Sequence, residues 1–358
     1  MRRFGVIGAG NGGQSMAGDL VLRGVNLSGI YDCNPAPIEA IRQRGGIKMS
    51  GPVMAGFAEI RCATTDVRQV VDSSDVLLVA VPANAHEAVA EQVAPHLRAG
   101  QVVTLFPGYV GGTLVFRKIL DRYPNTRGVV LAEAISMPYA TRLIEPAHAG
   151  IKARKKALPV AAFPATDTPK AVDALNEAFP EVIAWEDVLT VGLNNPNPML
   201  HVVKYIFNLG RIESPEVIGA DFHSWKSPTI DRIEHLAETE RLSVIQAMGL
   251  RPFSVEEFEQ LAYGGVMFKP LPQTRNIPAS ASQAPDRFIT EDVPMGLVPI
   301  AGFGRMFGVP TPTIDFLIDT ASFIRETDYR KTGRTPESLG LAGMDASGIA
   351  TFVRCGAA

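Results

Sequence analysis

The sequence predicts a doubly wound α/β domain with a mainly parallel sheet, followed by an all-α second domain. Short apolar runs alternate with helical patterns in the first half of the chain, and a glycine-rich turn follows the first of these runs. From about Leu189 the pattern changes to longer helical stretches broken by proline and glycine. We therefore expect a sheet covered on both faces within residues 1–188 and a helical domain within residues 189–358.

The first apolar run, residues 4–7, leads directly into a Gly-x-Gly-x-x-Gly turn and a helical stretch. In such a turn the first glycine permits the sharp bend, the second lets the backbone approach a pyrophosphate, and the third lets the helix pack closely. The N–H groups at the start of the helix then face the phosphates. This pattern predicts a dinucleotide-binding Rossmann domain. The residues that we expect to bind the cofactor here are Gly8, Gly10, Asn11, Gly12 and Gly13.

An acidic residue, Asp32, ends the second predicted strand, residues 27–31. It lies nineteen residues after the last glycine of the turn, where a carboxylate accepts hydrogen bonds from the adenosine ribose. A carboxylate there repels a 2′-phosphate, and residues 33–35 contain no arginine or lysine. The sequence therefore favours NAD(H). NADP(H) stays possible, since Arg42 or Arg44 could reach the phosphate from the next helix.

The remaining predicted strands place further residues at the same edge of the sheet. These strands are residues 76–81, 102–106, 128–133 and 157–163. In an open parallel sheet, ligands lie at the carboxyl ends of the strands. We therefore expect Pro82 and Gly108 to line the cofactor groove and Glu133 to face the substrate. His86 is either a groove residue or an ordinary histidine at the start of a helix.

Length, composition and charge narrow the class of protein. A chain of 358 residues with 46% hydrophobic and 20% charged residues is typical of a two-domain globular enzyme. A net charge of −3 does not favour binding to nucleic acid or to an anionic membrane. Three scattered cysteines fit a reducing compartment and form no metal motif, and no apolar run is long enough for a membrane span. We expect a cytoplasmic enzyme without a metal.

The second domain contains a candidate for proton transfer. Residues 194–201 open a predicted helix, and His201 follows Asn197 by four residues, so both can share one face. A helix N-terminus favours the neutral form of a histidine, which suits a group that exchanges a proton near neutral pH. From position alone, a structural histidine remains the alternative.

Motifs spaced along nearly the whole chain carry a family resemblance. They are residues 8–13, 81–83, 107–108, 111–112, 116–120, 195–201, 291–293, 296–299, 309–312, 333–335 and 339–341. Together they resemble the bacterial and invertebrate opine dehydrogenases, the octopine and nopaline dehydrogenase family. Such enzymes have a Rossmann domain followed by a helical domain, with the active site in the cleft between them.

The resemblance implies an activity and a set of site residues. The family condenses an α-keto acid such as pyruvate with the amino group of an amino acid, and it reduces the imine with NAD(P)H to a secondary-amine dicarboxylate. The matching catalytic pair here is His201 and Asp292, in which the carboxylate fixes the imidazole tautomer. Arg287 matches the cation of the cleft and suits a carboxylate or phosphate. We expect Asn197 and Tyr205 to contact substrate as well.

Two other functions stay open from the residues alone. Lys204 lies three residues after His201, on nearly the same helix face, so either could serve as the acid of a hydroxyacid dehydrogenase or ketopantoate-type reductase. A non-catalytic dinucleotide sensor is the third hypothesis. For the leading hypothesis the partners are an α-keto acid and an amino acid, and a homodimer is an expectation because helical domains of this superfamily often dimerise.

Some further positions bear on substrate binding. Both co-substrates carry a carboxylate, for which Arg142 is a second candidate cation. An apolar pocket is expected if Met199, Tyr205, Met267 and Phe268 face inward, and it would favour apolar amino donors. The composition of residues 264–286 predicts a surface loop that could act as a lid. We expect the charged residues 327–335 to form a solvated linker to the last helix, and the family resemblance of residues 333–335 leaves a position near the cleft as the alternative.

Overall fold

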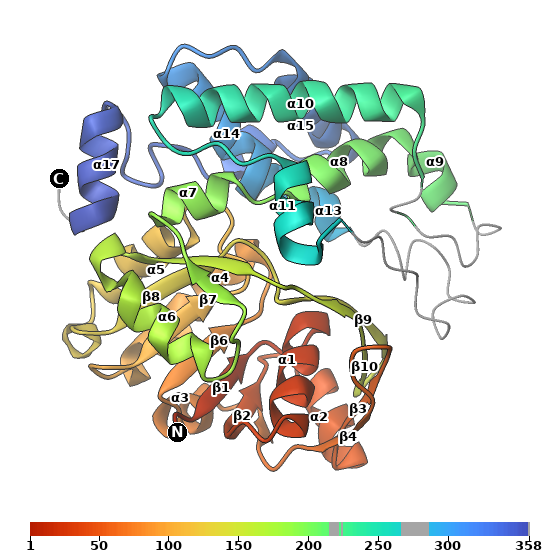
Figure 1. Ribbon diagram of the computed structural model, residues 1–358, viewed down its shortest axis with the longest axis vertical. Coiled ribbons are helices and arrows are strands. Elements are labelled where there is room, and N and C mark those ends of the chain that lie inside the picture. The colour runs from red at the N-terminus through yellow and green to blue at the C-terminus, as the bar shows by residue number, and fades with distance from the viewer. Residues whose placement is uncertain (215–221, 223–224, 266–285, 357–358) are drawn as a thin grey trace.

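A computed structural model describes residues 1–214, 222, 225–265 and 286–356. An eight-stranded sheet with the order β12-β11-β8-β7-β6-β1-β2-β5 occupies the first half of the chain (Figure 1). Its pairs are parallel except for β8 with β11. The strands are β1 Phe4–Ile7, β2 Leu27–Tyr31, β5 Ala63–Thr64, β6 Val76–Val79, β7 Val102–Leu105, β8 Val130–Ala134, β11 Leu158–Phe163 and β12 Val182–Ala184. The predicted fold class is confirmed.

Helices cover both faces of this sheet. In β6, Val76 and Leu78 belong to the apolar core on one face, and Leu77 and Val79 belong to the core on the other. Such double burial is the reason for the uninterrupted apolar runs in the sequence. The covering helices are α1 Asn11–Leu22, α2 Pro35–Arg44, α3 Val67–Ser73, α4 His86–Val93, α5 Gly112–Leu120 and α6 Thr168–Asn176.

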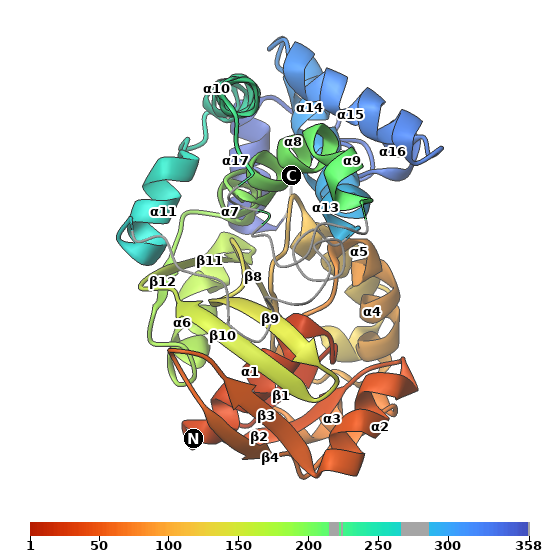
Figure 2. The ribbon, with the colours of Figure 1, turned by 90° about the vertical axis from the view of Figure 1, so that its right-hand side faces the viewer.

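A second, four-stranded sheet was absent from the prediction. Its order is β4-β3-β10-β9, and Figure 2 shows it beside α1. The contact is tight, because a Cβ atom at Gly18 of α1 would lie 2.2 Å from Sδ of Met49. The strands are β3 Gly46–Ser50, β4 Gly56–Glu59, β9 Tyr139–Glu145 and β10 His148–Arg154.

The second half of the chain is helical. After Ala184, the described residues form helices and loops and no strand, and they lie above the carboxyl-end edge of the large sheet in Figure 1. Arg241, fully buried, joins the helices by donating to the carbonyls of Leu193 and Phe253, each at 3.0 Å. No described helix has the length and apolar character needed to cross a membrane. The elements are α7 Val188–Leu193, α8 Asn197–Phe207, α9 Leu209–Ile212, α10 Pro228–Ala247, α11 Val255–Tyr263, α13 Arg287–Thr290, the π-helix η7 Val293–Leu297, α14 Val298–Met306, α15 Pro312–Ile324, α16 Tyr329–Thr332 and α17 Ala346–Cys355.

Candidate active site

The glycine-rich turn has the backbone geometry that the motif predicts. Gly8 has a φ of +102°, and a Cβ atom there would lie 2.6 Å from the carbonyl oxygen of Ala80. A Cβ atom at Gly13 would lie 1.7 Å from the carbonyl oxygen of Gly8, so neither position accepts a side chain. A Cβ atom at Gly10 would meet no atom of the described residues within 4 Å, apart from its neighbours in the chain. The backbone at Gly10 is therefore open to close approach by a ligand.

The start of α1 can receive an anion. Its N-cap, Gly10, provides no side-chain hydrogen bond, and the first turn contains no acidic residue. Asn11 donates from Nδ2 to the carbonyl of Thr141 at 3.2 Å, and its buried Oδ1 has no partner in the described part of the chain. Gly12 faces Met137, since a Cβ atom would lie 2.7 Å from Cε of that residue. Uncapped N–H groups at a helix N-terminus fit a pyrophosphate.

Asp32 is held at the same turn. Its Oδ2 accepts a hydrogen bond from the backbone N–H of Ala9 at 2.6 Å, and its Oδ1 accepts one from the N–H of Asn34 at 2.9 Å. The carboxylate is partly exposed at the end of β2. It therefore lies at the glycine-rich turn, where a ribose hydroxyl can donate to it.

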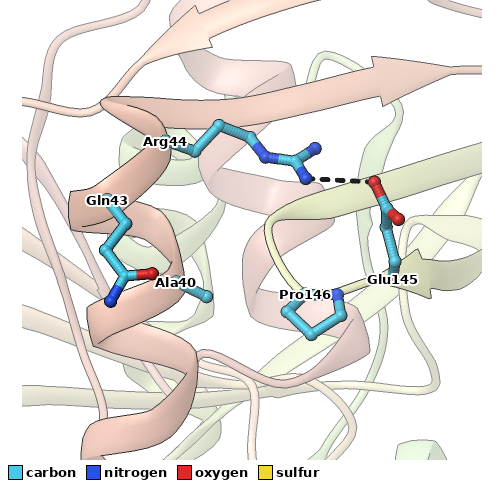
Figure 3. Close-up of a pocket in the computed structure, with 5 residues that line it drawn as sticks. All are labelled: Ala40, Gln43, Arg44, Glu145 and Pro146. Atoms are coloured by element: carbon cyan, nitrogen blue, oxygen red, sulfur yellow. Dashed lines mark hydrogen bonds and ion pairs between the residues drawn. The ribbon is translucent and has the colours of Figure 1, made fainter.

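The two arginines that could bind a 2′-phosphate contact other protein groups. Arg42 donates from Nε to the carbonyl of Ala63 at 2.7 Å. Arg44 forms an ion pair with Glu145 at 3.0 Å (Figure 3). This pair lines a surface pocket between α2 and the β9–β10 turn, and the pocket contains none of the predicted site residues.

Pro82 and Gly108 lie after β6 and β7, as predicted. Pro82 is exposed and precedes the 3-10 turn η1, Ala83–Ala85. A Cβ atom at Gly108 would lie 2.5 Å from Oε2 of Glu133, so this glycine makes room for a carboxyl group. The same Oε2 accepts from the N–H and Oγ1 of Thr113, each at 2.9 Å.

Glu133 is fully buried under this loop, contrary to the expectation that it faces the substrate. Burial raises the pKa of Glu133 to about 7, and the hydrogen bonds from Thr113 counteract only part of that rise. The side chain therefore belongs to the interior of the dinucleotide-binding domain.

The structure brings His201 and Asp292 together. His201 lies on α8, Asp292 directly precedes η7, and Nδ1 of the imidazole is 2.7 Å from Oδ2 of the carboxyl group. Both side chains are buried. The other oxygen of Asp292 accepts a hydrogen bond from the hydroxyl of Tyr109, which comes from the loop after β7. The pair therefore lies where the two domains meet.

Burial controls the protonation of this pair. It lowers the pKa of His201 well below its ordinary value, and the positive charges of Arg287, Lys204 and Arg142 act in the same direction. It also raises the pKa of Asp292 to about 7, while Arg287 and the Tyr109 hydroxyl act in the opposite direction. Groups this close titrate as a unit. The pair can therefore gain or lose a proton near neutral pH.

Two arginines lie near the pair. Arg287 begins α13, contacts Oε2 of Glu291 at 3.3 Å and keeps 44% of its side chain exposed. Arg142 lies on β9, where burial and the charge of Arg287 lower its pKa to about 10. Within the described residues the guanidinium of Arg142 forms no hydrogen bond or ion pair. A carboxylate between them would relieve this repulsion.

Asn197 and Tyr205 occupy opposite ends of the His201 helix. Asn197 approaches the site, because its Nδ2 is 3.5 Å from the hydroxyl oxygen of Tyr109. The hydroxyl of Tyr205 donates to Oδ1 of Asp286 at 3.0 Å and accepts from Arg325 at 2.7 Å. The hydroxyl of Tyr205 is thus engaged, and the side chain is 2% exposed and part of the apolar core.

Lys204 is committed to an ion pair. Its Nζ is 2.6 Å from Oε1 of Glu234 on α10, and it donates to the carbonyl of Leu200 at 3.2 Å. The side chain is almost fully buried. The ion pair with Glu234 accounts for a buried lysine at this position without a role as the acid.

The predicted apolar pocket is only partly visible. Met199 is buried in the core of the helical domain. Met267 and Phe268 lie outside the described residues, as does most of the predicted loop 264–286.

One residue that the sequence analysis missed joins the domains. The segment 327–335 was expected to be a solvated linker, but Arg334 within it is buried. Its Nη1 donates to the carbonyls of Gly108 and Val110 at 3.1 and 3.0 Å. Its Nη2 donates to the carbonyl of Ala83 at 2.9 Å and lies 3.0 Å from Nδ1 of His86. The resemblance at residues 333–335 was the only signal for this position.

Family models match both halves of the chain. The model described as NAD/NADP octopine/nopaline dehydrogenase, alpha-helical domain, matches residues 184–325. The model described as NADP oxidoreductase coenzyme F420-dependent matches residues 3–104. These matches show a nicotinamide-dependent oxidoreductase with a Rossmann-like domain and a helical domain.

The chain also has full-length relatives. An opine dehydrogenase of Arthrobacter sp. (strain 1C) is 34% identical, and the match covers 98% of this chain and 99% of that protein. A structure of octopine dehydrogenase with NADH and L-arginine has a TM-score of 0.74 at 19% identity and covers 98% of both chains. A structure of yersinopine dehydrogenase with NADP⁺ has a TM-score of 0.67 at 16% identity, covering 99% of this chain and 98% of that one. These two likenesses show the fold, and the 34% identity over the whole length shows that the chain belongs to the opine dehydrogenase family.

Proposed function

We propose that this protein reductively condenses an α-keto acid with the amino group of an L-amino acid, and catalyses the reverse oxidation. The carrying observation is the buried pair of His201 and Asp292, 2.7 Å apart, at the junction with the dinucleotide-binding domain. A histidine held by a carboxylate is suited to proton exchange near neutral pH. We assign these two residues as catalytic and divide the chain into a cofactor domain, 1–188, and a substrate domain, 189–358.

The chemistry needs one proton carrier. The amino group adds to the keto carbon, and the resulting carbinolamine loses its hydroxyl as water after accepting a proton. Because Nδ1 of His201 is hydrogen-bonded to Asp292, we assign this proton transfer to Nε2 of the same imidazole. The bound nicotinamide cofactor supplies the hydride that reduces the iminium to a secondary amine. In the oxidative direction His201 accepts the proton instead.

The co-substrates bring two carboxylates to a site with two arginines. We assign Arg287 and Arg142 to carboxylate binding, with Asn197 and Tyr205 as further contacts. The support is the position of Arg287 beside Glu291 and the lack of a partner for Arg142 among the described residues. Guanidinium groups bind carboxylates through paired N–H bonds.

The cofactor we propose is NAD(H). Gly8, Gly10, Asn11, Gly12, Gly13, Asp32, Pro82 and Gly108 are the residues that we assign to its binding. Support for this choice comes from Asp32 at the ribose position and from the ion pair of Arg44 with Glu145. Helix α2 begins at Pro35, near Asp32, and ends at Arg44. Because a helix rises about 1.5 Å per residue, Arg44 lies roughly 14 Å along the axis from Pro35.

A substrate screen tests the proposal. NADH oxidation is followed with pyruvate alone, with an amino acid alone and with both, and the product is identified by mass. We expect turnover that requires both co-substrates. The expected product has the mass of their sum minus one water plus two hydrogens, which is a net loss of one oxygen atom. Turnover with the keto acid alone would instead indicate a hydroxyacid dehydrogenase or ketopantoate-type reductase. NADH binding without turnover on any substrate would indicate a dinucleotide sensor.

We also propose a cytoplasmic location and a homodimer. Support for self-association is the exposure of Phe316 and Phe323, at 51% and 86%, which are seven residues apart on one face of α15. Sedimentation of the purified protein checks the dimer, and a monomer at micromolar concentration would contradict it.

A further inference from the structure

Tyr109 contacts Asp292 across the domain junction. It follows β7 in the dinucleotide-binding domain, and its hydroxyl donates to Oδ1 of Asp292. The oxygen Oδ2 of the same carboxyl group faces Nδ1 of His201 at 2.7 Å. Tyr109 is 1% exposed, and the contact joins residues 183 positions apart. Each oxygen of Asp292 therefore has a separate partner from a separate domain.

The backbone of Tyr109 is fixed on several sides. Its φ of 54° is in the left-handed region, which a residue with a side chain adopts only when its surroundings impose it. Arg334 binds the carbonyls of Gly108 and Val110, on either side of the tyrosine. A Cβ atom at Gly192 of α7 would lie 2.4 Å from the carbonyl oxygen of Tyr109, so the helix packs directly on this peptide.

A backbone hydrogen bond ties the same loop to the segment after Asp292. The N–H of Val110 donates to the carbonyl of Met295 in η7 at 3.3 Å. Arg334 also donates its own N–H to the carbonyl of Pro294 at 2.9 Å. The loop that presents the tyrosine and the turn that presents the carboxyl group thus form one connected unit.

We propose that Tyr109 is a positioning residue that holds the carboxyl group of Asp292 against His201. The cofactor domain thereby completes the pair that the helical domain supplies. The catalytic meaning of this role rests on the proposed function, but the role itself concerns only the orientation and charge of Asp292.

The charged groups around His201 and Asp292 determine how loss of the Tyr109 hydroxyl should change the pKa of this pair. The groups that act on the pair from the neighbouring elements are Tyr109, Arg142, Lys204, Arg287 and Glu291. Removing the hydroxyl removes the hydrogen bond that stabilises the carboxylate, so the pair should bind its proton at a higher pH than in the wild type. The cationic groups stay in place in such a variant.

A double-mutant cycle of Tyr109→Phe and Asp292→Asn tests the proposal in the full-length enzyme. We expect Tyr109→Phe to lower kcat/KM about tenfold or more in the wild-type background, because a hydrogen bond to a charged group is lost. In the Asp292→Asn background we expect the same substitution to change kcat/KM less than about twofold, because the two residues act through one contact. Additive effects would overturn the proposal.

A second readout needs no turnover. The chain has six histidines, so the imidazole signal of His201 can be assigned in histidine-labelled protein by its loss in His201→Asn. We expect the apparent pKa followed by this signal to rise in Tyr109→Phe. An unchanged titration would overturn the proposal even if the enzyme is active. A shifted titration in a protein without opine activity would support it while refuting the proposed function.

Tyr139→Phe is the matched control. Tyr139 is also buried, and its hydroxyl donates to Oδ2 of Asp19 at 2.6 Å within the dinucleotide-binding domain. This substitution should lower thermal stability, as loss of a buried hydrogen bond does. It should leave the His201 titration unchanged. An equal titration shift in both variants would indicate a general loss of stability and would overturn the specific role of Tyr109.

Discussion

The imidazole of His201 stacks on the ring of Phe288, with ring centroids 3.8 Å apart and ring planes inclined by 21°. The edge of the same imidazole contacts Asp292. Phe288 and Asp292 are four residues apart, so one short segment contacts both the face and the edge of the histidine. The ring can neither turn about χ2 nor shift along α8 without losing one of these contacts.

The first prediction concerns the histidine. His201→Asn should lower kcat for imine reduction by about 10²- to 10⁴-fold, because proton transfer loses its carrier. The affinity for NADH, measured by fluorescence titration, should stay within about twofold. His148→Asn is the control, since His148 pairs with Ser50 on the second sheet and should keep full activity. Full turnover in His201→Asn would refute its catalytic role.

The second prediction is a pH dependence of opine oxidation. Burial raises the pKa of Asp292 to about 7, and the pair must be deprotonated to accept a proton from the substrate. The value of kcat/KM should therefore rise with pH through about 7 and level off above it. In Asp292→Asn this rise should disappear from the profile. An identical profile in both proteins would assign the titration to another group.

The third prediction concerns stability. The pKa of Glu133 is raised to about 7 from an ordinary 4.5, so the folded protein holds this proton more tightly than the unfolded chain. The stabilisation is fully present below about pH 4.5 and is lost as pH rises through about 7, at a cost of about 3 kcal/mol. Glu133→Gln should remove this dependence. The difference in melting temperature, Glu133→Gln minus wild type, should therefore be more positive at pH 8 than at pH 5.

The matched control for that experiment is Glu87→Gln. Glu87 is an exposed carboxylate in the first turn of α4. Its substitution should shift the melting temperature equally at pH 5 and pH 8. A flat difference for Glu133→Gln as well would mean that Glu133 is ionised in the folded protein.

The fourth prediction concerns substrate affinity. Arg142→Gln should raise KM for the keto acid or the amino acid about tenfold or more, because a charge-assisted contact is lost. The melting temperature should not fall, since the guanidinium of Arg142 has no hydrogen bond or ion pair within the described residues. Arg44→Gln breaks the remote pair with Glu145 and should leave both KM values unchanged. Unaltered KM values in Arg142→Gln would exclude it from carboxylate binding.

The fifth prediction concerns cofactor choice. The wild type should use NADH better than NADPH, and Asp32→Ser should reduce this preference about tenfold, because a neutral side chain no longer repels a 2′-phosphate. The ratio of kcat/KM for the two cofactors is the measurement. A wild-type preference for NADPH would show that another cation overrides Asp32.

The sequence predicted six of the eight strands of the large sheet, because the central strands are buried on both faces, and it missed the short edge strands β5 and β12. Strands such as Phe4–Ile7 and Val76–Val79 contain only apolar residues and glycine. The second sheet escaped prediction for the opposite reason. His148–Arg154 on β10 mixes Lys152 and Arg154 with small residues, and β9 carries Arg142 on a partly exposed surface, so neither shows a clear apolar pattern.

Some parts of the candidate site could be predicted from the sequence and others could not. The glycine-rich turn and Asp32 belong to a local motif, so spacing alone predicted their arrangement. His201 and Asp292 are 91 residues apart, and only the family resemblance paired them. Tyr109 and Arg334 act through contacts between distant segments, with Arg334 reaching Gly108 from 226 positions away. No local pattern in a single sequence encodes such contacts.

The late position of Arg334 has a consequence for biosynthesis. Its guanidinium joins the loops after β6 and β7, but the ribosome makes it only after residues 1–333. The nascent dinucleotide-binding domain has all its strands long before this arginine leaves the exit tunnel. A chain whose translation stops early can therefore carry an intact nucleotide fold while lacking the guanidinium that fixes its two loops.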